Sequence, residues 1–430
     1  QQDGISAWWY PSQAFATQPR GLMEIYLNTN APQHDIKAKV LLALWDDLYS
    51  LEQSALATEA DIAGMQMRLN DGNGITLTLS GFTDKQSALL KQALAGLKVN
   101  TDEQGFAQAK DRYVRALQNK GKEFPFYQAF NAYSDLVKNG NFETTDLIAA
   151  AQSLTQADLT AFINSTLANN QARIFAFGNY DKADIAKVAQ MVKQALPGKR
   201  NELPYSRSAY WKPAPGQTLV VQKDIDVADV ALVDVHVHPE ASYRQLARAT
   251  VLKSHFSNIA FDKLRTEEQL AYAVGGTATQ LEDFVGFAMY IQTPIKGVAD
   301  MQARFDSFKQ QYAAELDKLT EDAFAQLKAS TLITLKESAK NLQDEVGPLI
   351  TDWYREKFSF DSKQQLIAAV EQVTLEQVKA FYRETMLNDN AARISVQMRG
   401  TKFRDQPFAD LPGQTKVTDV AAFHQQMKKQ

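Results

Sequence analysis

The sequence predicts an α+β fold made of two homologous α/β sandwich domains, each a mostly antiparallel sheet covered on one face by helices. Three observations lead to this prediction. Strand and helix patterns follow the order strand, helix, hairpin, several helices and strand, and this order occurs twice in 430 residues. Local sequence matches relate the two copies. A segment rich in Pro and Gly separates them.

The first copy begins with an alternating β-rich stretch at 22–27 and an amphipathic helix at about 33–50. Alternating residues then flank NDGNG at 70–74, which predicts a hairpin whose Gly, Asn and Asp residues supply positive φ angles. Helices follow at 84–97 and 103–120 and continue to Leu167, with Thr155 and Asp158 at capping-box spacing, before a strand at 172–178.

The second copy has a strand at 229–237, a helix at 242–264, a hairpin of strands 272–280 and 284–293 around Glu282 and Asp283, further helices, and a strand at 392–398. GFAQAK at 105–110 matches AFAQLK at 323–328, and NNQARI at 169–174 matches NDNAARI at 388–394. The displacement of about 220 residues indicates a domain duplication rather than an array of short repeats.

The segment between the copies, 196–216, breaks both the helix and the strand periods with its Pro and Gly residues. We therefore expect a first repeat at 1–203, a second at 204–400 and a C-terminal extension at 401–430. The extension is polar and is expected to be a wrapped or loose tail.

Composition excludes several classes of function. Hydrophobic residues make up 45% and charged residues 22%, and no apolar run is long enough to span a bilayer, so the sequence predicts a soluble protein. The net charge of −4, with both signs interleaved, argues against nucleic acid as a partner. The absence of Cys excludes disulfides, thiol catalysis and thiolate metal sites.

Histidine is scarce, so candidate metal ligands are few. His236 and His238 lie two apart in a strand and face the same side, a spacing found in metal sites. The alternative is that both are polar residues on a less buried face, with Val235 and Val237 in the core. Without Cys or an obvious third ligand, this structural role is favoured. The remaining histidines are expected on helix or tail surfaces: His34, His255 and His424.

Motifs for other chemistry are absent. The sequence contains no HExxH or HxxEH zinc motif, no GxSxG motif, no P-loop and no dinucleotide GxGxxG motif. The adjacent acids Glu267 and Glu268, like Asp46 and Asp47, diverge on a helix, so we expect solvated helix faces rather than a general acid–base pair.

The segment LRTEEQLAYAV at 264–274 is the strongest site candidate. It places Arg265 and Tyr272 on either side of a helix-to-strand turn, just before Gly275 and Gly276. A guanidinium offers a fixed fork of donors for a carbonyl or carboxylate, and a phenol can donate to a developing oxyanion. The competing interpretation pairs Arg265 with one of the two following glutamates and half-buries Tyr272 at a strand start.

The internal repeat helps to separate these interpretations. Aligning TEADIAGM at 58–65 with TEEQLAYA at 266–273 places Ala57 opposite Arg265 and Gly64 opposite Tyr272. Because a purely structural pair would more readily be kept in both copies, its presence in only one favours a function.

LRTEEQLAYAV resembles the fourth-domain motif of the pitrilysin and insulin-degrading-enzyme family of zinc metalloendopeptidases, which reads much like LRTKEQLGYIV. The resemblance includes the preceding strand, the following hairpin and the duplicated domains, and so covers nearly the whole chain. It implies a processing-peptidase-like metallohydrolase fold of four homologous domains, whose two halves close like a clamshell around a peptide. Since the HxxEH motif of the first domain is missing, the chain resembles domains three and four, the C-terminal half.

The resemblance also implies roles and partners. Arg265 would hold a substrate carbonyl, and Tyr272 would help to bind the substrate or the tetrahedral intermediate. Zinc would be bound in the N-terminal half, so this chain would contain no metal ligand or catalytic residue and would be inactive alone. The partners would be that zinc-bearing half and small peptides, with no nucleic acid and no membrane, and the location would be periplasmic as in bacterial members.

Two alternatives stay open. One is a non-catalytic scaffold or peptide-binding subunit of the same fold. The other is a metal-binding module that uses His236 and His238.

Overall fold

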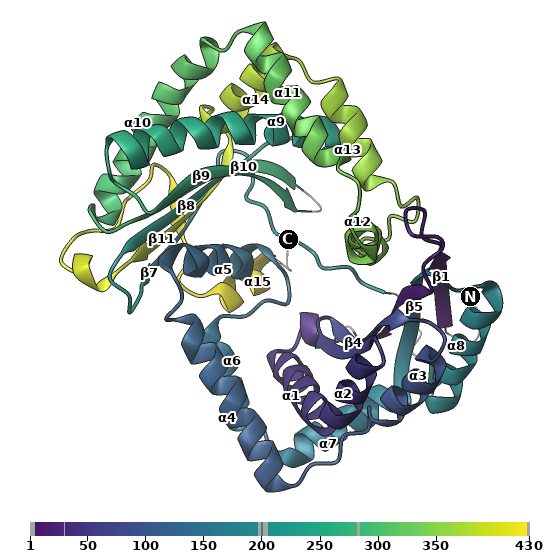
Figure 1. Cartoon of the computed structure of the whole chain (residues 1–430). Coiled ribbons are helices and arrows are strands. Elements are labelled where there is room, and N and C mark those ends of the chain that lie inside the picture. The colour runs from purple at the N-terminus through teal and green to yellow at the C-terminus, as the bar shows by residue number, and fades with distance from the viewer. Residues whose placement is uncertain (1–4, 30, 197–198, 201–204, 282–283, 428–430) are drawn as a thin grey trace. The chain divides into compact units, whose positions relative to one another are not determined.

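The structure is a computed structural model that describes residues 5–29, 31–196, 199–200, 205–281 and 284–427 (Figure 1). The chain divides into two compact units, each built around its own sheet. Unit 1 comprises Gln1–Leu117, Thr144–Ser208 and Ser338–Phe360, and unit 2 comprises Gln118–Glu143, Ala209–Glu337 and Asp361–Gln430.

Unit 1 carries sheet 1 and the helices that pack on it. Its strands are β1 (Ile5–Tyr10), β2 (Arg20–Asn28), β3 (Met65–Asp71), β4 (Gly74–Phe82), β5 (Asn169–Gly178) and β6 (Lys199–Arg200). Its helices are η1 (Ala31–Gln33), α1 (Ile36–Glu52), α2 (Ser54–Ile62), α3 (Gln86–Ala95), most of α4 (Glu103–Lys120), α6 (Thr144–Ser153), α7 (Gln156–Ala168), α8 (Lys182–Ala195) and α12 (Leu342–Tyr354).

Unit 2 carries sheet 2. Its strands are β7 (Thr218–Asp224), β8 (Val230–Val237), β9 (Ala273–Leu281), β10 (Phe284–Thr293), β11 (Ala392–Arg399) and β12 (Gln414–Lys416). Its helices are α5 (Pro125–Val137), α9 (Tyr243–Ala260), η2 (Phe261–Glu267), α10 (Val298–Asp317), α11 (Glu321–Lys336), α13 (Ser362–Glu371), α14 (Leu375–Met386), η3 (Thr401–Phe403) and α15 (Val420–Met427).

The two sheets share one topology. Sheet 1 runs β1-β5-β2-β4-β3, and sheet 2 runs β7-β11-β8-β10-β9 with β12 beyond β7. Along each five-strand path the first pair is parallel and the next three pairs are antiparallel. This correspondence confirms the predicted α+β fold of two related, largely antiparallel sheets. Sequence patterns did not predict β1, β7 or α8.

The hairpin of β3 and β4 is confirmed, but its turn differs from the expectation. Neither Gly72 nor Gly74 has a φ in the left-handed region. Gly74 is required by close packing instead, because a Cβ there would lie 2.1 Å from the Leu27 carbonyl oxygen of neighbouring β2. The predicted positive φ is therefore wrong. The equivalent turn residues Glu282 and Asp283 lie outside the described residues.

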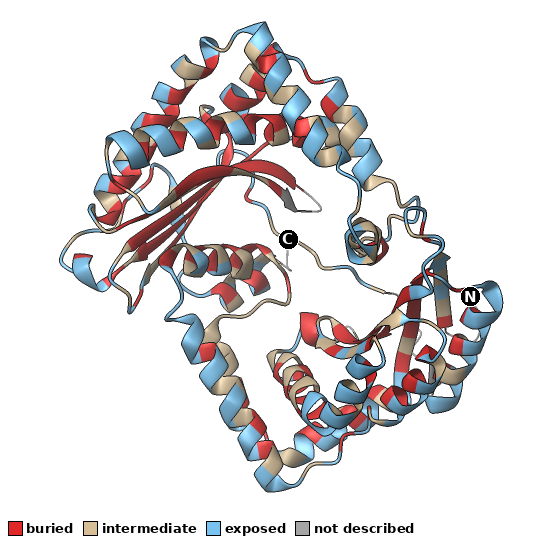
Figure 2. Ribbon diagram, in the orientation of Figure 1, coloured by how far each residue is buried: buried red, intermediate tan, exposed pale blue. Residues whose placement is uncertain are grey.

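Both faces of each sheet are covered, so the prediction of helices on one face is wrong. All eight residues of β8 are buried, and Figure 2 shows the strands of sheet 2 buried along most of their length. One face of sheet 1 packs on α1, α3, α7 and α8, and one face of sheet 2 packs on α9, α10 and α14. The opposite faces are covered by α12 on sheet 1 and by α5 with α15 on sheet 2.

These outer helices are exchanged along the sequence. Helix α5 lies in the first half of the chain but packs in unit 2, and α12 lies in the second half but packs in unit 1. The contiguous ranges 1–203 and 204–400 therefore stay a prediction about the sequence repeat.

Arg173 on β5 contacts α12 and so helps to hold this helix against sheet 1. Its guanidinium carbon lies 3.7 Å from the ring centroid of Tyr205 and 5.0 Å from those of Trp8 and Trp353. Its Nη2 also donates to the Trp353 carbonyl at 3.5 Å. Arg173 is only 2% exposed, so the aromatic faces replace much of the water that the charge gives up.

The C-terminal extension is wrapped rather than loose. β12 pairs in parallel with the edge strand β7, and α15 packs beside α5. His424 on α15 is buried, and its Nε2 lies 2.9 Å from the Leu136 carbonyl oxygen of α5. The expectation that His424 lies at the surface is therefore wrong. Packing of α15 on α5 encloses the imidazole.

The histidines of β8 face the helical layer, in contrast to the predicted less buried face. Val235 and Val237 point into the core under α5, whereas His236 and His238 are 5% and 4% exposed on the opposite face. His238 stacks on Phe381 of α14 at 5.5 Å between ring centroids. With both faces of the strand covered, neither histidine reaches solvent.

His236 belongs to a buried polar cluster centred on Asp234. Arg393 binds the Asp234 carboxylate through two hydrogen bonds of 2.7 Å, and Lys309 lies 3.5 Å from it. Arg393 and Lys309 hold the pKa of Asp234 well below its usual range, although burial acts in the opposite direction. The Lys309 Nζ is 3.2 Å from His236 Nε2. Burial lowers the pKa of His236 to about 4, so the imidazole is neutral at pH 7.

Trp353→Ala is expected to lower the free energy of unfolding by about 3–5 kcal/mol, because it removes a fully buried indole and one wall of the Arg173 site. Urea denaturation followed by circular dichroism measures the change. The matched control is Trp9→Ala, since the Trp9 side chain is 42% exposed. Equal losses in both variants would contradict the proposed attachment of α12.

His236→Gln should change how stability depends on pH. The pKa of His236 is about 4 in the folded state and about 6.5 when unfolded, so between these values the unfolded chain binds more protons. We compare the free energy of unfolding of the wild type with that of the variant. The wild-type value minus the variant value should be constant above about pH 6.5 and should fall by about 3 kcal/mol as the pH approaches 4. His34→Gln, at an exposed site, is the control. A pH-independent difference would show that His236 is not buried as a neutral group.

Candidate functional site

The candidate segment begins where α9 changes its winding. The predicted helix 242–264 ends as an α-helix at Ala260 and continues as the π-helix η2 to Glu267. Leu270 N then donates to the Leu264 carbonyl at 2.9 Å, and Gln269 adopts a left-handed φ of 53°. A non-Gly residue in this region is strained, and π-helical turns occur often at functional sites.

Two leucines anchor this turn. Leu264 is fully buried and Leu270 is 5% exposed, and both belong to the core between sheet 2 and its helices. Arg265 follows the first anchor directly and is exposed. The apolar anchors thus fix the backbone while the charged side chain stays outside the core.

Arg265 forms neither of the ion pairs that the structural interpretation requires. Glu267 pairs with Lys263 at 2.6 Å, and Glu268 receives two hydrogen bonds from Arg304 at 2.9 and 2.6 Å. The Arg265 guanidinium instead lies over the Phe261 ring, 4.6 Å from its centroid. Its fork of donors is therefore available to a ligand, and the expected pairing with the adjacent glutamates is wrong.

Tyr272 is also more exposed than that interpretation predicts. The side chain is 65% exposed, not half-buried, and within the described ranges no hydrogen bond reaches its hydroxyl. Its backbone N–H donates to the Gln292 carbonyl at 3.1 Å, which fixes the residue at the entrance to β9. The phenol is held at its base and free at its polar end.

The adjacent glycines have a packing role. A Cβ on Gly276 would lie 2.5 Å from the Phe256 ring, and one on Gly275 would lie 2.8 Å from the Tyr290 hydroxyl. Ser257 Oγ bridges α9 to β9 by bonding both the N–H and the carbonyl of Gly276 at 3.1 Å. These glycines let α9 approach β9 closely and thereby position the turn.

The repeat counterpart of this segment lies in unit 1. β3 begins directly after Gly64 as β9 begins directly after Tyr272, which agrees with the alignment of the two copies. Ala57 and Gly64 provide no polar group there, and Gly64 has a φ of 72°. The cation and the phenol are therefore special to unit 2.

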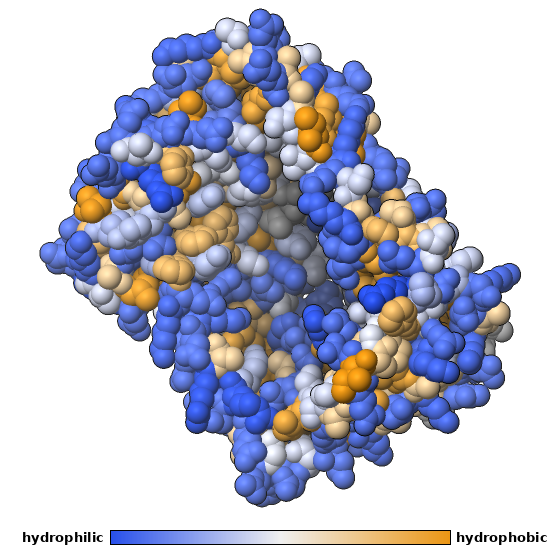
Figure 3. Space-filling model, in the orientation of Figure 1, coloured by the Kyte–Doolittle hydropathy of each residue, from blue (hydrophilic) through white to orange (hydrophobic). Residues whose placement is uncertain are grey.

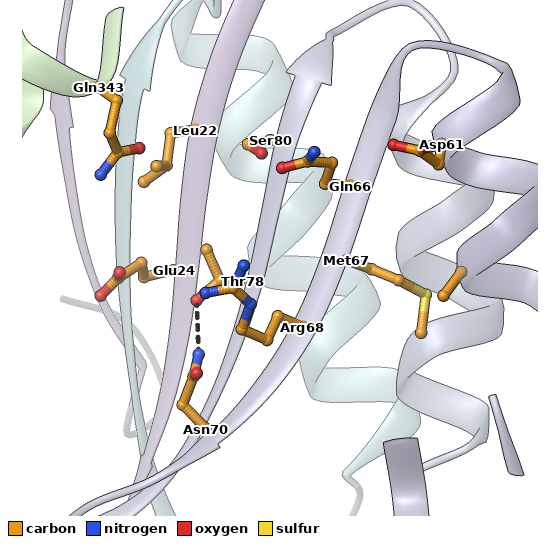
Figure 4. A pocket seen from close by; sticks show the side chains of 11 residues that line it. Leu22, Glu24, Asp61, Gln66, Met67, Arg68, Asn70, Thr78, Ser80 and Gln343 are labelled. Carbon is orange, nitrogen blue, oxygen red and sulfur yellow. Dashed lines mark hydrogen bonds between the residues drawn. The ribbon is translucent and has the colours of Figure 1, made fainter. Parts of the chain in front are cut away.

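A polar cavity of about 640 Å³ occupies the corresponding place in unit 1 (Figure 4). It is lined by Leu22, Glu24, Ala57, Asp61, Gln66, Met67, Arg68, Asn70, Thr78, Ser80 and Gln343. Burial raises the pKa of Glu24, whose Oε2 accepts a hydrogen bond of 2.7 Å from the Tyr354 hydroxyl. Sequence patterns did not single out this site. The only indication of this site in the sequence is the presence of polar residues at alternate positions of β2, β3 and β4.

The other acidic pair also has separate partners. Asp47 is bound by Arg112 through hydrogen bonds of 3.2, 3.2 and 2.6 Å. Asp46 is half-buried, and burial with neighbouring Asp71 raises its pKa to about 7. The two carboxylates diverge as predicted, but Asp46 does not lie on a fully solvated face.

The partners of the histidines of β8 bear on the metal-binding alternative. In the described part of the chain no three His, Cys, Asp or Glu side chains are grouped to hold a metal ion. His236 faces the ammonium of Lys309, and both ring nitrogens of His238 have partners, in the backbone of Glu240 and the carboxylate of Glu384. The Lys309 ammonium lies at the His236 ring nitrogen that a metal ion would need, and Asp234 is already bound by Arg393, so the donor set does not fit zinc.

The surface offers no single large apolar area in the view of Figure 3, where hydrophilic residues surround small apolar groups. Among the described helices, none has the length and apolar character needed to cross a bilayer.

Comparison with known proteins gives two family matches. Residues 1–150 match the middle or third domain of peptidase M16, and residues 251–350 match domain 4 of the C-terminal lobe of PQQ synthase PqqF-like proteins. Protease 3 of Escherichia coli is 23% identical over 97% of this chain and 43% of its own length. Human insulin-degrading enzyme is 26% identical over 85% of this chain and 36% of its own length.

Solved structures show the same fold. A pitrilysin crystal structure superposes with a TM-score of 0.93 at 22% identity, covering 99% of this chain and 45% of that one. A structure described as a peptidase M16 inactive domain from Pseudomonas fluorescens has a TM-score of 0.69 at 15% identity. The chain spans less than half the length of protease 3 and pitrilysin. These matches identify it as a relative of the M16 peptidases that corresponds to their third and fourth domains.

Proposed function

We propose that this chain is the C-terminal, non-zinc half of a clamshell metalloendopeptidase that degrades small peptides, and that Arg265 and Tyr272 contact the substrate. The availability of Arg265 carries the proposal. Both neighbouring glutamates are neutralised by other cations, so the guanidinium is left for a ligand. The buried side chains of Leu264 and Leu270 anchor the backbone that carries Arg265.

The chemistry of the two groups fits substrate positioning. The Arg265 fork can bind a peptide carbonyl, and its stacking on Phe261 limits its rotamers before the substrate arrives. The Tyr272 hydroxyl can donate to the oxyanion of a tetrahedral intermediate. Zinc, which would activate the attacking water, belongs to the N-terminal half in this proposal, and no group of three potential metal ligands is found among the described residues of this chain.

Closure of two halves would bring these donors to the reacting peptide, so catalysis would depend on closure. The proposed partners are the zinc-bearing half and peptides, and the proposed compartment is the bacterial periplasm. A non-catalytic scaffold or peptide-binding subunit is the second candidate, favoured by the similarity to a structure described as an inactive domain.

Arg265→Ala and Tyr272→Phe, each in the enzyme assembled with its zinc half, should lower kcat/KM for a quenched fluorescent peptide. Loss of a donor to the transition state is expected to cost roughly 10²–10³-fold. Arg265→Lys should rescue little, because an ammonium lacks the planar fork.

Matched controls come from exposed residues of the same types. Arg244→Ala removes an arginine whose side chain is 74% exposed, and Tyr127→Phe alters a tyrosine that is 52% exposed. Both should keep normal turnover. Near-normal kcat/KM in the Arg265 and Tyr272 variants would reject the assignment and favour the non-catalytic alternative.

The 430-residue chain should contain far less than one equivalent of zinc after dialysis, because His236 lies beside the Lys309 ammonium and His238 is already bonded. Inductively coupled plasma mass spectrometry measures the content, with the zinc-bearing enzyme as positive control. Stoichiometric zinc that is lost in His236→Gln would instead support the metal-binding module.

A further inference from the structure

The edge of sheet 1 at β3 has unused backbone groups. Phe82 N donates to the Gly64 carbonyl at 3.2 Å, and Gly72 N donates to the Gly74 carbonyl at 2.9 Å. In an antiparallel pair the residues that bond the partner strand alternate with residues that face away. Even-numbered residues of β3 therefore bond β4, and Met65, Met67 and Leu69 direct their N–H and C=O groups outward.

These outward groups have no partner among the described residues. β3 ends the strand order of sheet 1, and no hydrogen bond from a turn, loop or side chain of the described chain reaches the backbone of Met65, Met67 or Leu69. An open edge of this kind is a template for an added strand.

Space for such a strand exists beside the edge. The 640 Å³ cavity is lined by Met67 and extends past it to Ala57 and Asp61 of α2. An added strand would run about 4.8 Å from β3. Its alternate side chains would enter the cavity beside Gln66 and Arg68, which project from the same face of β3 (Figure 4).

The charges of the cavity favour a basic side chain. Glu24 and Asp61 supply two carboxyl groups, whereas Arg68 is the one cation among its lining residues. Arg68 also interacts with Asp46, which lies outside the cavity. Its positive charge is therefore shared and neutralises Glu24 and Asp61 less completely. Glu24 lies on the same face of the sheet as Arg68, whereas Asp61 belongs to α2 on the other face. A Lys or Arg of an extended chain would therefore face an acidic group on whichever side of the sheet it points to.

We propose that the open edge of β3 and this cavity bind an extended peptide segment carrying Lys or Arg, as an additional strand of sheet 1. This site does not include Arg265 or Tyr272. The proposal rests on the function proposed above, because it takes peptides as the ligands. Although β3 and β9 are equivalent strands, the contacts they would offer a peptide differ: unit 1 would use the backbone of β3, and unit 2 would use the side chains of Arg265 and Tyr272.

The test uses the full-length protein and a fluorescein-labelled peptide of six Val-Lys repeats. Met67→Pro removes one outward N–H without breaking the β3–β4 ladder, and Met67→Ala is the matched control that loses the side chain but keeps the N–H. Fluorescence anisotropy should show binding at least about tenfold weaker for the Pro variant than for the Ala variant. Equal affinities would overturn the proposal.

Two further measurements locate the site. In the wild-type protein, hydrogen–deuterium exchange of residues 65–71 should slow on addition of the peptide, and unchanged exchange at saturation would overturn the proposal without any variant. A peptide methylated at alternate backbone nitrogens should bind weakly, and Glu24→Gln with Asp61→Asn should abolish the preference for Val-Lys over Val-Glu repeats.

This result is separable from the function proposed above. Arg265→Ala should leave protection of 65–71 intact while lowering peptide hydrolysis by the enzyme assembled with its zinc half. Met67→Pro should weaken binding of the Val-Lys peptide although Arg265 is unchanged. Loss of protection in Arg265→Ala would mean that the peptide is held from unit 2, which would overturn an independent site at β3.

Discussion

The structure depends on one constraint, which is that each sheet carries a cluster of apolar side chains on both of its faces and both clusters must be covered. β8 is buried along its whole length, and the outer face of sheet 1 presents Phe175 and Phe177 to the rings of α12. Each sheet therefore needs a helix on its second face, and the chain supplies it from the opposite half of the sequence. The exchange of α5 and α12 ties the folding of one unit to the segments of the other.

The candidate substrate contacts depend on the same burial. Leu264 and Leu270 hold the π-helical turn against the core of unit 2, and Gln269 accepts a strained φ between them. In the part of the chain that the structure describes, no salt bridge around the turn involves Arg265, although two glutamates lie within three residues of it. The result is a rigid backbone with one cation and one phenol exposed, an arrangement suited to positioning a ligand.

The buried polar residues serve a different purpose. Asp234 and Asp306 balance the charges of Lys309 and Arg393 within the helical layer of unit 2, and His236 lies between Asp234 and Lys309 as a neutral imidazole. Unit 1 has its polar groups on the other face of its sheet, around the cavity beside β3. The duplicated topology thus carries exposed side-chain donors beside β9 in one copy and a polar cavity beside β3 in the other.

Sequence periodicity by itself determined most of β2, β3, β4, β5, β8, β9, β10 and β11, the two hairpins and the capping box at Thr155, because these follow from contacts within one element or between neighbours. It also singled out Arg265 and Tyr272, since their residue types and their asymmetry between the copies are visible locally. A short edge strand such as β1 has no such pattern, and α8 was missed although Asp181 and Asp184 form a capping box. Only the tertiary structure decided which faces are covered, because α5 and α12 reach their sheets from distant sequence. For the same reason, only the tertiary structure placed His424 in the core, paired Glu268 with Arg304 instead of Arg265, and formed the cavity beside β3.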